Sequence, residues 1–124
     1  MDAVCEALSD ADECVTHELL AKLADKWSLW TLSVLAASKA PLRFSRVLDG
    51  VDGISQKSLT KTLRQLERDG LATRRLYAEV PPRVEYAITP LAIELLEQVK
   101  PLWMWVAGNA GRFQTARERY DSRA

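Results

Sequence analysis

The residues with the clearest capacity for chemistry lie in one segment, from Gly53 to Gly70. Leu59, Leu63 and Leu66 recur at helical spacing and form one apolar stripe. The opposite side of the same helix carries the cations Lys57, Lys61, Arg64 and Arg68. A charged helix face is most often simply solvated, but this face carries almost only one sign of charge. The pattern therefore predicts a helix that packs by its leucines and offers its cations to a polyanion such as DNA.

Amide and hydroxyl groups accompany the cations at the beginning of this segment. Ser55 can cap the helix because its hydroxyl can accept a hydrogen bond from a free backbone N–H, and Gly70 can end it in the left-handed conformation. Gln56 is the strongest candidate for reading a base, since its amide can pair bidentately with adenine. The polar side chains expected at base edges and at close backbone positions are Ser55, Gln56, Ser58, Thr60 and Thr62.

Positive charge is concentrated around this segment. The 124 residues hold 17 cations and 17 anions, but residues 39–86 hold ten cations against six anions. This excess of four positive charges predicts a basic docking face between acidic flanks, and an affinity for double-stranded DNA that falls steeply with salt. Phosphate contacts are expected from Lys57, Lys61, Arg64, Arg74, Arg75 and Arg83. Contacts to the flanking DNA backbone are expected from Arg43 and Ser45.

Cys14 is the candidate for a chemical sensor. A reactive thiolate is favoured by a helix N-terminus or a nearby cation, and Cys14 lies near the expected start of the first helix. The alternative is that Cys14 packs as a small hydrophobic residue. Cys5 could resolve an oxidised Cys14 or pair across a dimer. The two cysteines and the lone His17 lack the spacing of a metal site, so we expect no metal and no other cofactor.

Two helices are expected before the basic segment. The first runs from a cap at Asp10 or Asp12 to about Ala24, and the second from Lys26 to about Ala37. The second is apolar nearly all round, which predicts a central, buried helix. Its tryptophans are most simply core residues, and the alternative is that they line a pocket for a small ligand. These tryptophans are Trp27 and Trp30.

The chain around the basic segment has the pattern of a helix-turn-helix with a wing. A very short strand at residues 42–44 and a short helix at 44–48 precede it. After it the hydrophobic period changes to two, which predicts strands at 71–77 and 84–88. Pro81 and Pro82 cannot sit inside a strand ladder, so they belong to the hairpin loop. An arginine-bearing hairpin beside a basic helix is a wing.

The last long helix is expected to begin at Thr89 and Pro90, a favoured cap and first helical residue. Pro101 should kink or interrupt it, and Gly108 and Gly111 should loosen the chain before a charged tail. Apolar residues of this helix and of the first helix predict contact with a second copy of the chain. The alternative is that the tryptophans fold back on their own core. The expected interface residues are Val15, Leu19, Leu102, Trp103, Trp105 and Val106.

These segments predict a mainly α fold with a small β-hairpin. The organisation is a flexible N-terminus at 1–11, a winged helix-turn-helix domain with N- and C-terminal dimerisation helices at 12–107, and a C-terminal tail at 108–124. Neither a signal peptide nor a membrane span is evident, so a cytoplasmic setting is expected. The sequence shows no nucleophile–base pair, phosphate-binding loop or close carboxylate pair, so we do not expect an enzyme.

Several motifs, in this order, resemble the HxlR family of winged-helix regulators, relatives of the MarR group. They are Cys14, Lys26-Trp27, Leu42 to Ser45, the ISQKSLT block from Ile54 to Thr60, the LERDGL block from Leu66 to Leu71, the PPRVEY block from Pro81 to Tyr86, and Thr89. The resemblance covers the chain from about Cys14 to Trp105.

The resemblance implies a homodimeric transcription factor that binds a short inverted repeat, with one recognition helix of each subunit in a major groove. It also implies a sensing role for Cys14, because several members respond to oxidants or electrophiles through a cysteine at that position. We therefore expect a sequence-specific DNA-binding repressor. The alternatives are a regulator that responds to a non-covalent small-molecule ligand and a winged helix used for protein–protein contact.

Overall fold

The computed structural model describes residues 10–123. Its elements are α2 (Asp10–Leu23), α3 (Lys26–Ala37), β1 (Leu42–Arg43), α4 (Phe44–Gly50), α5 (Gln56–Arg68), β2 (Ala72–Tyr77), β3 (Arg83–Ile88), α6 (Pro90–Gly108) and α7 (Ala110–Asp121). The predicted fold class is confirmed: the chain is mostly helical, with a small antiparallel sheet. Residues 1–9 of the predicted flexible N-terminus lie outside the described residues. Residues 10 and 11 begin α2.

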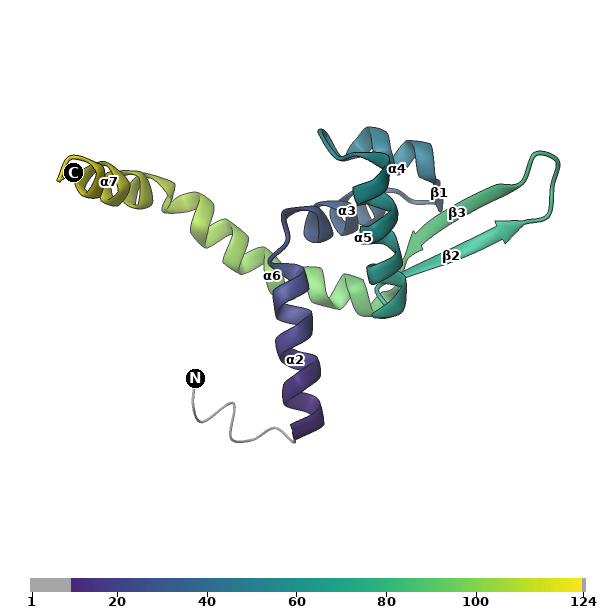
Figure 1. The fold of residues 1–124 in the computed structure, drawn as a ribbon, viewed down its shortest axis with the longest axis horizontal. Coiled ribbons are helices and arrows are strands. Elements are labelled where there is room, and N and C mark those ends of the chain that lie inside the picture. Colours follow the sequence, from purple (N-terminus) through teal and green to yellow (C-terminus); the bar gives the residue numbers. More distant parts are fainter. Residues whose placement is uncertain (1–9, 124) are drawn as a thin grey trace.

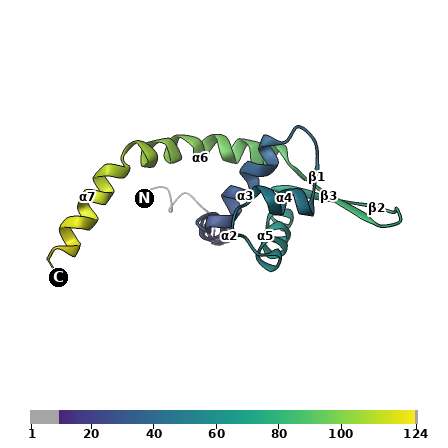
Figure 2. The same ribbon diagram turned by 90° about the horizontal axis from the view of Figure 1, so that it is seen from above.

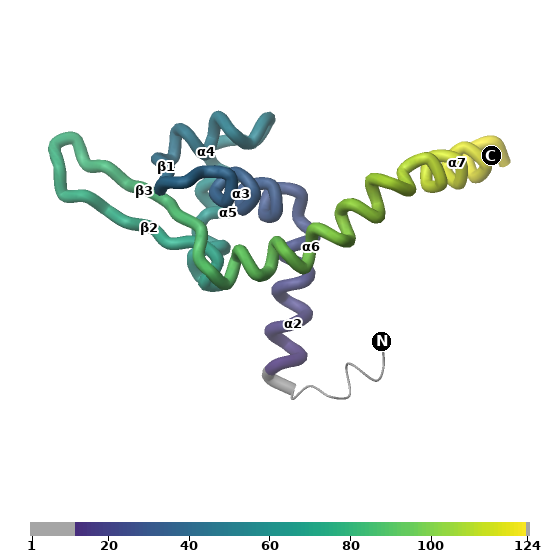
Figure 3. The backbone as a smooth tube through the Cα atoms, turned by 180° about the vertical axis from the view of Figure 1, so that it is seen from behind, coloured from purple at the N-terminus to yellow at the C-terminus, as the bar shows by residue number. Residues whose placement is uncertain are grey.

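The elements form a body with an extension at each end. Helix α3 is central and contacts α2, α4, α5, α6 and β3. The β2–β3 hairpin protrudes from one end of the body, whereas α6 and α7 form an arm at the opposite end (Figures 1 and 2). Helix α2 projects from the body on its own (Figure 3). Within residues 10–123, no helix combines the length and hydropathy that crossing a membrane requires.

Side chains from α3, α4 and α5 make most of the core, and Val51, Ile54, Leu71, Ala72 and Ala92 complete it. The predicted leucine stripe of α5 is buried, which confirms the helical pattern. Trp27 packs against this core, whereas Trp30 stacks on Trp27 with ring centroids 6.0 Å apart and is 39% exposed. The interpretation of the tryptophan pair as core is therefore wrong for Trp30. The largest fully buried side chains are Leu32, Leu59, Leu63, Val47, Val51 and Thr31.

The sheet has the strand order β1–β3–β2, with both pairs antiparallel. The predicted hairpin is confirmed, with Pro81 and Pro82 in its loop. Since side chains alternate between the two faces of a strand, Arg74 lies on one face and Arg75 on the other. Arg75 shares its face with Glu85, which lies directly opposite it on β3.

The C-terminal part of the chain is more ordered than the sequence predicts. Helix α6 continues through Pro101 without interruption. The residues predicted as a charged tail form helix α7 instead. Asn109 gives the physical reason, because its Nδ2 donates to the backbone oxygen of Trp105 at 2.8 Å and its Oδ1 accepts from Arg112 Nη1 at 3.2 Å. One side chain thus joins the end of α6 to the first turn of α7 and offsets the flexibility of the nearby glycines.

Candidate nucleic-acid interface

Helix α5 is fixed at both ends by the residues predicted to cap it. The hydroxyl oxygen of Ser55 accepts a hydrogen bond from the backbone nitrogen of Ser58 at 3.1 Å. Gly70 has a φ of +77°, the left-handed conformation that glycine adopts without steric cost. The Thr89 hydroxyl, at the start of α6, donates to the Gly70 carbonyl at 2.7 Å. The ends of α5 are therefore held to the body, and its exposed face has a defined orientation.

The exposed face of α5 carries the predicted cations. All four are exposed, and among the described residues none of the four takes part in an ion pair. Their charges are therefore available to a partner, since neither burial nor an acidic neighbour neutralises them. These residues are Lys57, Lys61, Arg64 and Arg68.

The polar candidates on α5 are divided by their burial. Ser55 and Gln56 are exposed, and Ser58 and Thr60 are half-buried. Thr62 is only 5% exposed, so the prediction that it reaches a base edge is wrong. Its position explains this result, because residue 62 is three residues after Leu59 and four before Leu66, on the side of the helix that packs into the core.

An open groove of about 650 Å³ runs along α5 beside the start of α4. Arg43 and Ser45 are exposed at that start, next to Phe44, which lines the groove. The sequence-based selection missed Phe44 and Gln65, because neither residue is charged. The lining residues are Phe44, Gln56, Lys57, Thr60, Lys61, Arg64 and Gln65.

The three predicted arginines of the hairpin have different environments. Arg74 and Arg75 are exposed. The side chain of Arg83 is only 28% exposed, and its Nη2 lies 3.2 Å from Oε1 of Glu79. Its Nε lies 3.7 Å from Oε1 of Glu85. The charge of Arg83 is therefore already engaged within the hairpin, whereas Arg74 and Arg75 are exposed and have no ion pair among the described residues.

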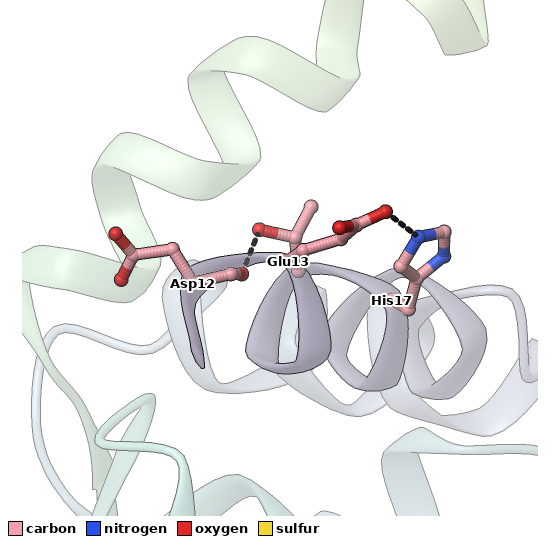
Figure 4. A network of polar contacts seen from close by, with 4 residues as sticks. Asp12, Glu13 and His17 are labelled. Carbon is pink, nitrogen blue, oxygen red and sulfur yellow. Dashed lines mark hydrogen bonds and ion pairs between the residues drawn. The ribbon is translucent and has the colours of Figure 1, made fainter. Parts of the chain in front are cut away.

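Cys14 is exposed in the second turn of α2. Its Sγ donates to Oε1 of Glu18 at 3.8 Å, so the contact it makes is with a carboxylate and not with a cation. The helix N-terminus acts mainly on the first turn, and the sequence-based argument for activation is correspondingly weaker. Nearby, Nε2 of His17 lies 3.5 Å from Oε1 of Glu13 (Figure 4). Cys5 lies outside the described residues.

Apolar side chains are exposed along α2 and, above all, along α6. The predicted alternative that the α6 tryptophans fold back on their own core is wrong: Trp103 is 70% exposed and Trp105 is 54% exposed. Trp105 instead meets Phe113 of α7 edge to face, with ring centroids 6.0 Å apart. Val15 is exposed and Leu19 is half-buried on α2. An apolar groove of about 260 Å³ between α3 and α6 is lined by Leu29, Val99, Leu102, Trp103, Val106 and Ala107.

Comparison with known protein families shows to which family the chain belongs. The model of the HxlR-like helix-turn-helix family matches residues 22–114, three quarters of the chain. The chain belongs to the HxlR-like family. The resemblance inferred from the sequence motifs is therefore confirmed.

Known transcriptional regulators are similar to this chain over most of its length. The HTH-type transcriptional regulator YtfH of Escherichia coli (strain K12) is 35% identical over 99 residues, which cover 80% of this chain and 77% of YtfH. The solved structure of the transcriptional regulator ytfH from Salmonella typhimurium is 33% identical with a TM-score of 0.70, over 83% of this chain and 90% of that one. The redox regulator HypR in its reduced form is 28% identical with a TM-score of 0.66, over 81% and 97%.

Membership of the HxlR-like family establishes the general function of the chain. The chain is a transcriptional regulator with a helix-turn-helix fold, and it is not an enzyme. The matched segment contains α3 to α6 complete, with the cationic face of α5 and the hairpin. It ends within α7, and it begins at residue 22, near the end of α2.

Proposed function

We propose that the protein binds double-stranded DNA as a homodimer, at an inverted repeat, and represses transcription. The observation that carries this proposal is the cationic face of α5, which is exposed and free of ion pairs among the described residues. An α-helix fits the major groove of B-DNA, and lysine and arginine side chains supply phosphate contacts. In this arrangement α5 is the recognition helix and the β2–β3 hairpin is a wing whose Arg74 and Arg75 contact the neighbouring DNA backbone.

Dimerisation is proposed from the exposed apolar residues of α6. Leu102 to Val106 are five consecutive exposed residues, and five consecutive positions surround a helix completely. One copy of the chain covers at most one side of such a helix. Exposed contiguous apolar surface of this kind marks an interaction site, and a second copy brings the same apolar surface. Two-fold symmetry of the dimer would then match an inverted repeat in the DNA.

Gel-shift binding of the reduced protein to DNA from upstream of its own gene tests the proposal directly. A discrete shift that survives an excess of unrelated duplex is expected. If the excess of unrelated duplex abolishes the shift, the result contradicts sequence-specific binding. Specific binding without any salt dependence would contradict the role of the α5 cations, because phosphate contacts release counterions.

Gln56→Ala is expected to reduce the preference for the selected DNA site by about 1–3 kcal/mol, with little change in affinity for unrelated duplex. The reason is that Gln56 is exposed at the first turn of α5 and carries an amide suited to a base edge. Lys57→Ala is the matched control, since it should weaken both kinds of binding alike. Competition binding assays measure both quantities. If Gln56→Ala, like Lys57→Ala, weakens binding to the selected site and to unrelated duplex equally, the result contradicts base reading by Gln56.

A second candidate function is release of DNA on oxidation through Cys14. Two observations favour it: Cys14 is exposed, and the redox regulator HypR is similar to this chain in structure. Cys14→Ser protein is expected to keep its DNA affinity in the presence of diamide, under conditions in which the wild type loses at least tenfold. Loss in both proteins would remove Cys14 from the response. No loss in either would favour a small-molecule signal, for which Trp27 lines an open groove of about 430 Å³.

A further inference from the structure

Arg83 makes three contacts within the wing, two with carboxylates and one with an aromatic ring. It lies directly opposite Tyr77 across the hairpin, and its guanidinium carbon is 4.1 Å from the centroid of the Tyr77 ring. Its two ion pairs join it to Glu79 in the loop and to Glu85 on its own strand. A cation with two carboxylate partners and a ring against it has little capacity left for a DNA phosphate.

Glu85 also lies directly opposite Arg75 in the β2–β3 register. Opposite charges at such a cross-strand position normally pair. In this wing the Glu85 carboxylate binds Arg83 instead, and among the described residues Arg75 has no ion pair. The guanidinium of Arg75 lies over the Tyr77 ring, 4.9 Å from its centroid, and the residue is exposed. The Glu85 carboxylate therefore forms an ion pair with Arg83, at 3.7 Å and without a hydrogen bond, and none with Arg75 among the described residues.

We propose that Arg83 is a positioning residue: by binding Glu85 it keeps Arg75 free to contact DNA. This inference rests on the proposed DNA binding and replaces the sequence-based expectation that Arg83 itself contacts phosphate. Tyr77 supports the arrangement, because both guanidiniums lie against its ring. The wing thus carries three arginines of which two, Arg74 and Arg75, are available to the DNA.

Arg83 could either position Arg75 or contact a DNA phosphate itself. The Arg83→Gln variant distinguishes these two roles when it is combined with replacement of Glu85 or of Glu79. Arg83→Gln alone is expected to lower the affinity for a mixed-sequence duplex by roughly threefold to tenfold, because Glu85 then pairs with Arg75. Adding Glu85→Gln should restore most of that affinity, since Arg75 is freed again. Adding Glu79→Gln is the matched control: it changes the charge of the wing equally, but Glu79 lies in the loop and not opposite Arg75.

The acid-to-amide changes also need to be made singly, so that their general gain in affinity can be subtracted in a double-mutant cycle. Coupling between Arg83 and Glu85 that exceeds the coupling between Arg83 and Glu79 supports the positioning role. If Glu85→Gln and Glu79→Gln restore DNA affinity equally in the Arg83→Gln background, the positioning role is overturned. A direct phosphate contact by Arg83 predicts this equality, because each change removes one negative charge from the wing.

A measurement without DNA makes the inference independent of the proposed function. NMR of the free protein should show slower hydrogen exchange of the Arg75 Nε–H in Arg83→Gln, and wild-type exchange in Arg83→Gln/Glu85→Gln. Unchanged exchange in all variants would overturn the positioning role even if DNA binding is intact. If the protein shows the expected change in Arg75 hydrogen exchange but binds no duplex, the DNA-binding proposal is overturned. The pairing of Glu85 with Arg75 in Arg83→Gln is still supported.

Discussion

Replacement of Lys57, Lys61 and Arg64 together by glutamine is expected to lower DNA affinity by roughly 100-fold or more at moderate salt. Each of these side chains is exposed, and within the described residues none of them is part of an ion pair, so each can neutralise one phosphate. The slope of log affinity against log salt should therefore become shallower by about three for each subunit. A salt titration of fluorescence anisotropy measures the affinity and the slope together.

Helix α7, with Arg123 just after it, offers a control with the same change of charge. Arg117, Arg119 and Arg123 are exposed. Helix α7 lies away from α5 and the wing (Figure 1). Their replacement by glutamine should leave the salt slope almost unchanged. Equal losses in the two triple variants would contradict a localised interface and would indicate attraction by overall charge. Because both sets of side chains are exposed, neither variant is expected to lose its fold, which circular dichroism can verify.

The sequence predicts α5 well because three independent signals agree there. The leucine period, the Ser55 cap and the Gly70 terminus all describe the same helix, and all three have the predicted roles. The burial of Thr62 shows where such reasoning fails. A threonine is compatible with solvent or core by its residue type, but its spacing of three residues from Leu59 and four from Leu66 places it beside the apolar stripe, where it is 5% exposed.

The wing and the arm depend on contacts that have no sequence pattern. Three arginines on a hairpin look equivalent in the sequence, but the strand register places Arg83 within reach of two carboxylates. Gly108 and Gly111 predict a loose chain by their propensity alone. The hydrogen bonds of Asn109 override that propensity, and α7 forms. In both cases the deciding interaction joins particular side-chain atoms, which residue types and periods do not specify.

Trp103→Glu is expected to convert the proposed dimer into a monomer, with the dimer dissociation constant raised by roughly 100-fold or more. Trp103 is 70% exposed in the single chain and lines the apolar groove between α3 and α6. Buried aromatic residues contribute most to interface affinity, and a carboxylate in an apolar contact adds a desolvation cost. Sedimentation velocity measures the change. Val80→Glu is the control, because Val80 is fully exposed in the loop between β2 and β3, and this hairpin lies at the other end of the molecule from the arm (Figure 1).

Loss of the dimer should also appear in DNA binding, through the number of phosphates contacted. A monomer presents one α5 and one wing, so the salt slope of Trp103→Glu should be about half that of the wild type. This result differs from that of the triple α5 variant, which stays dimeric with a reduced slope. A Trp103→Glu protein that remains dimeric would exclude this part of α6 from the interface. A monomer with an unchanged slope would instead show that a single subunit makes all the phosphate contacts, and the inverted repeat would no longer be required.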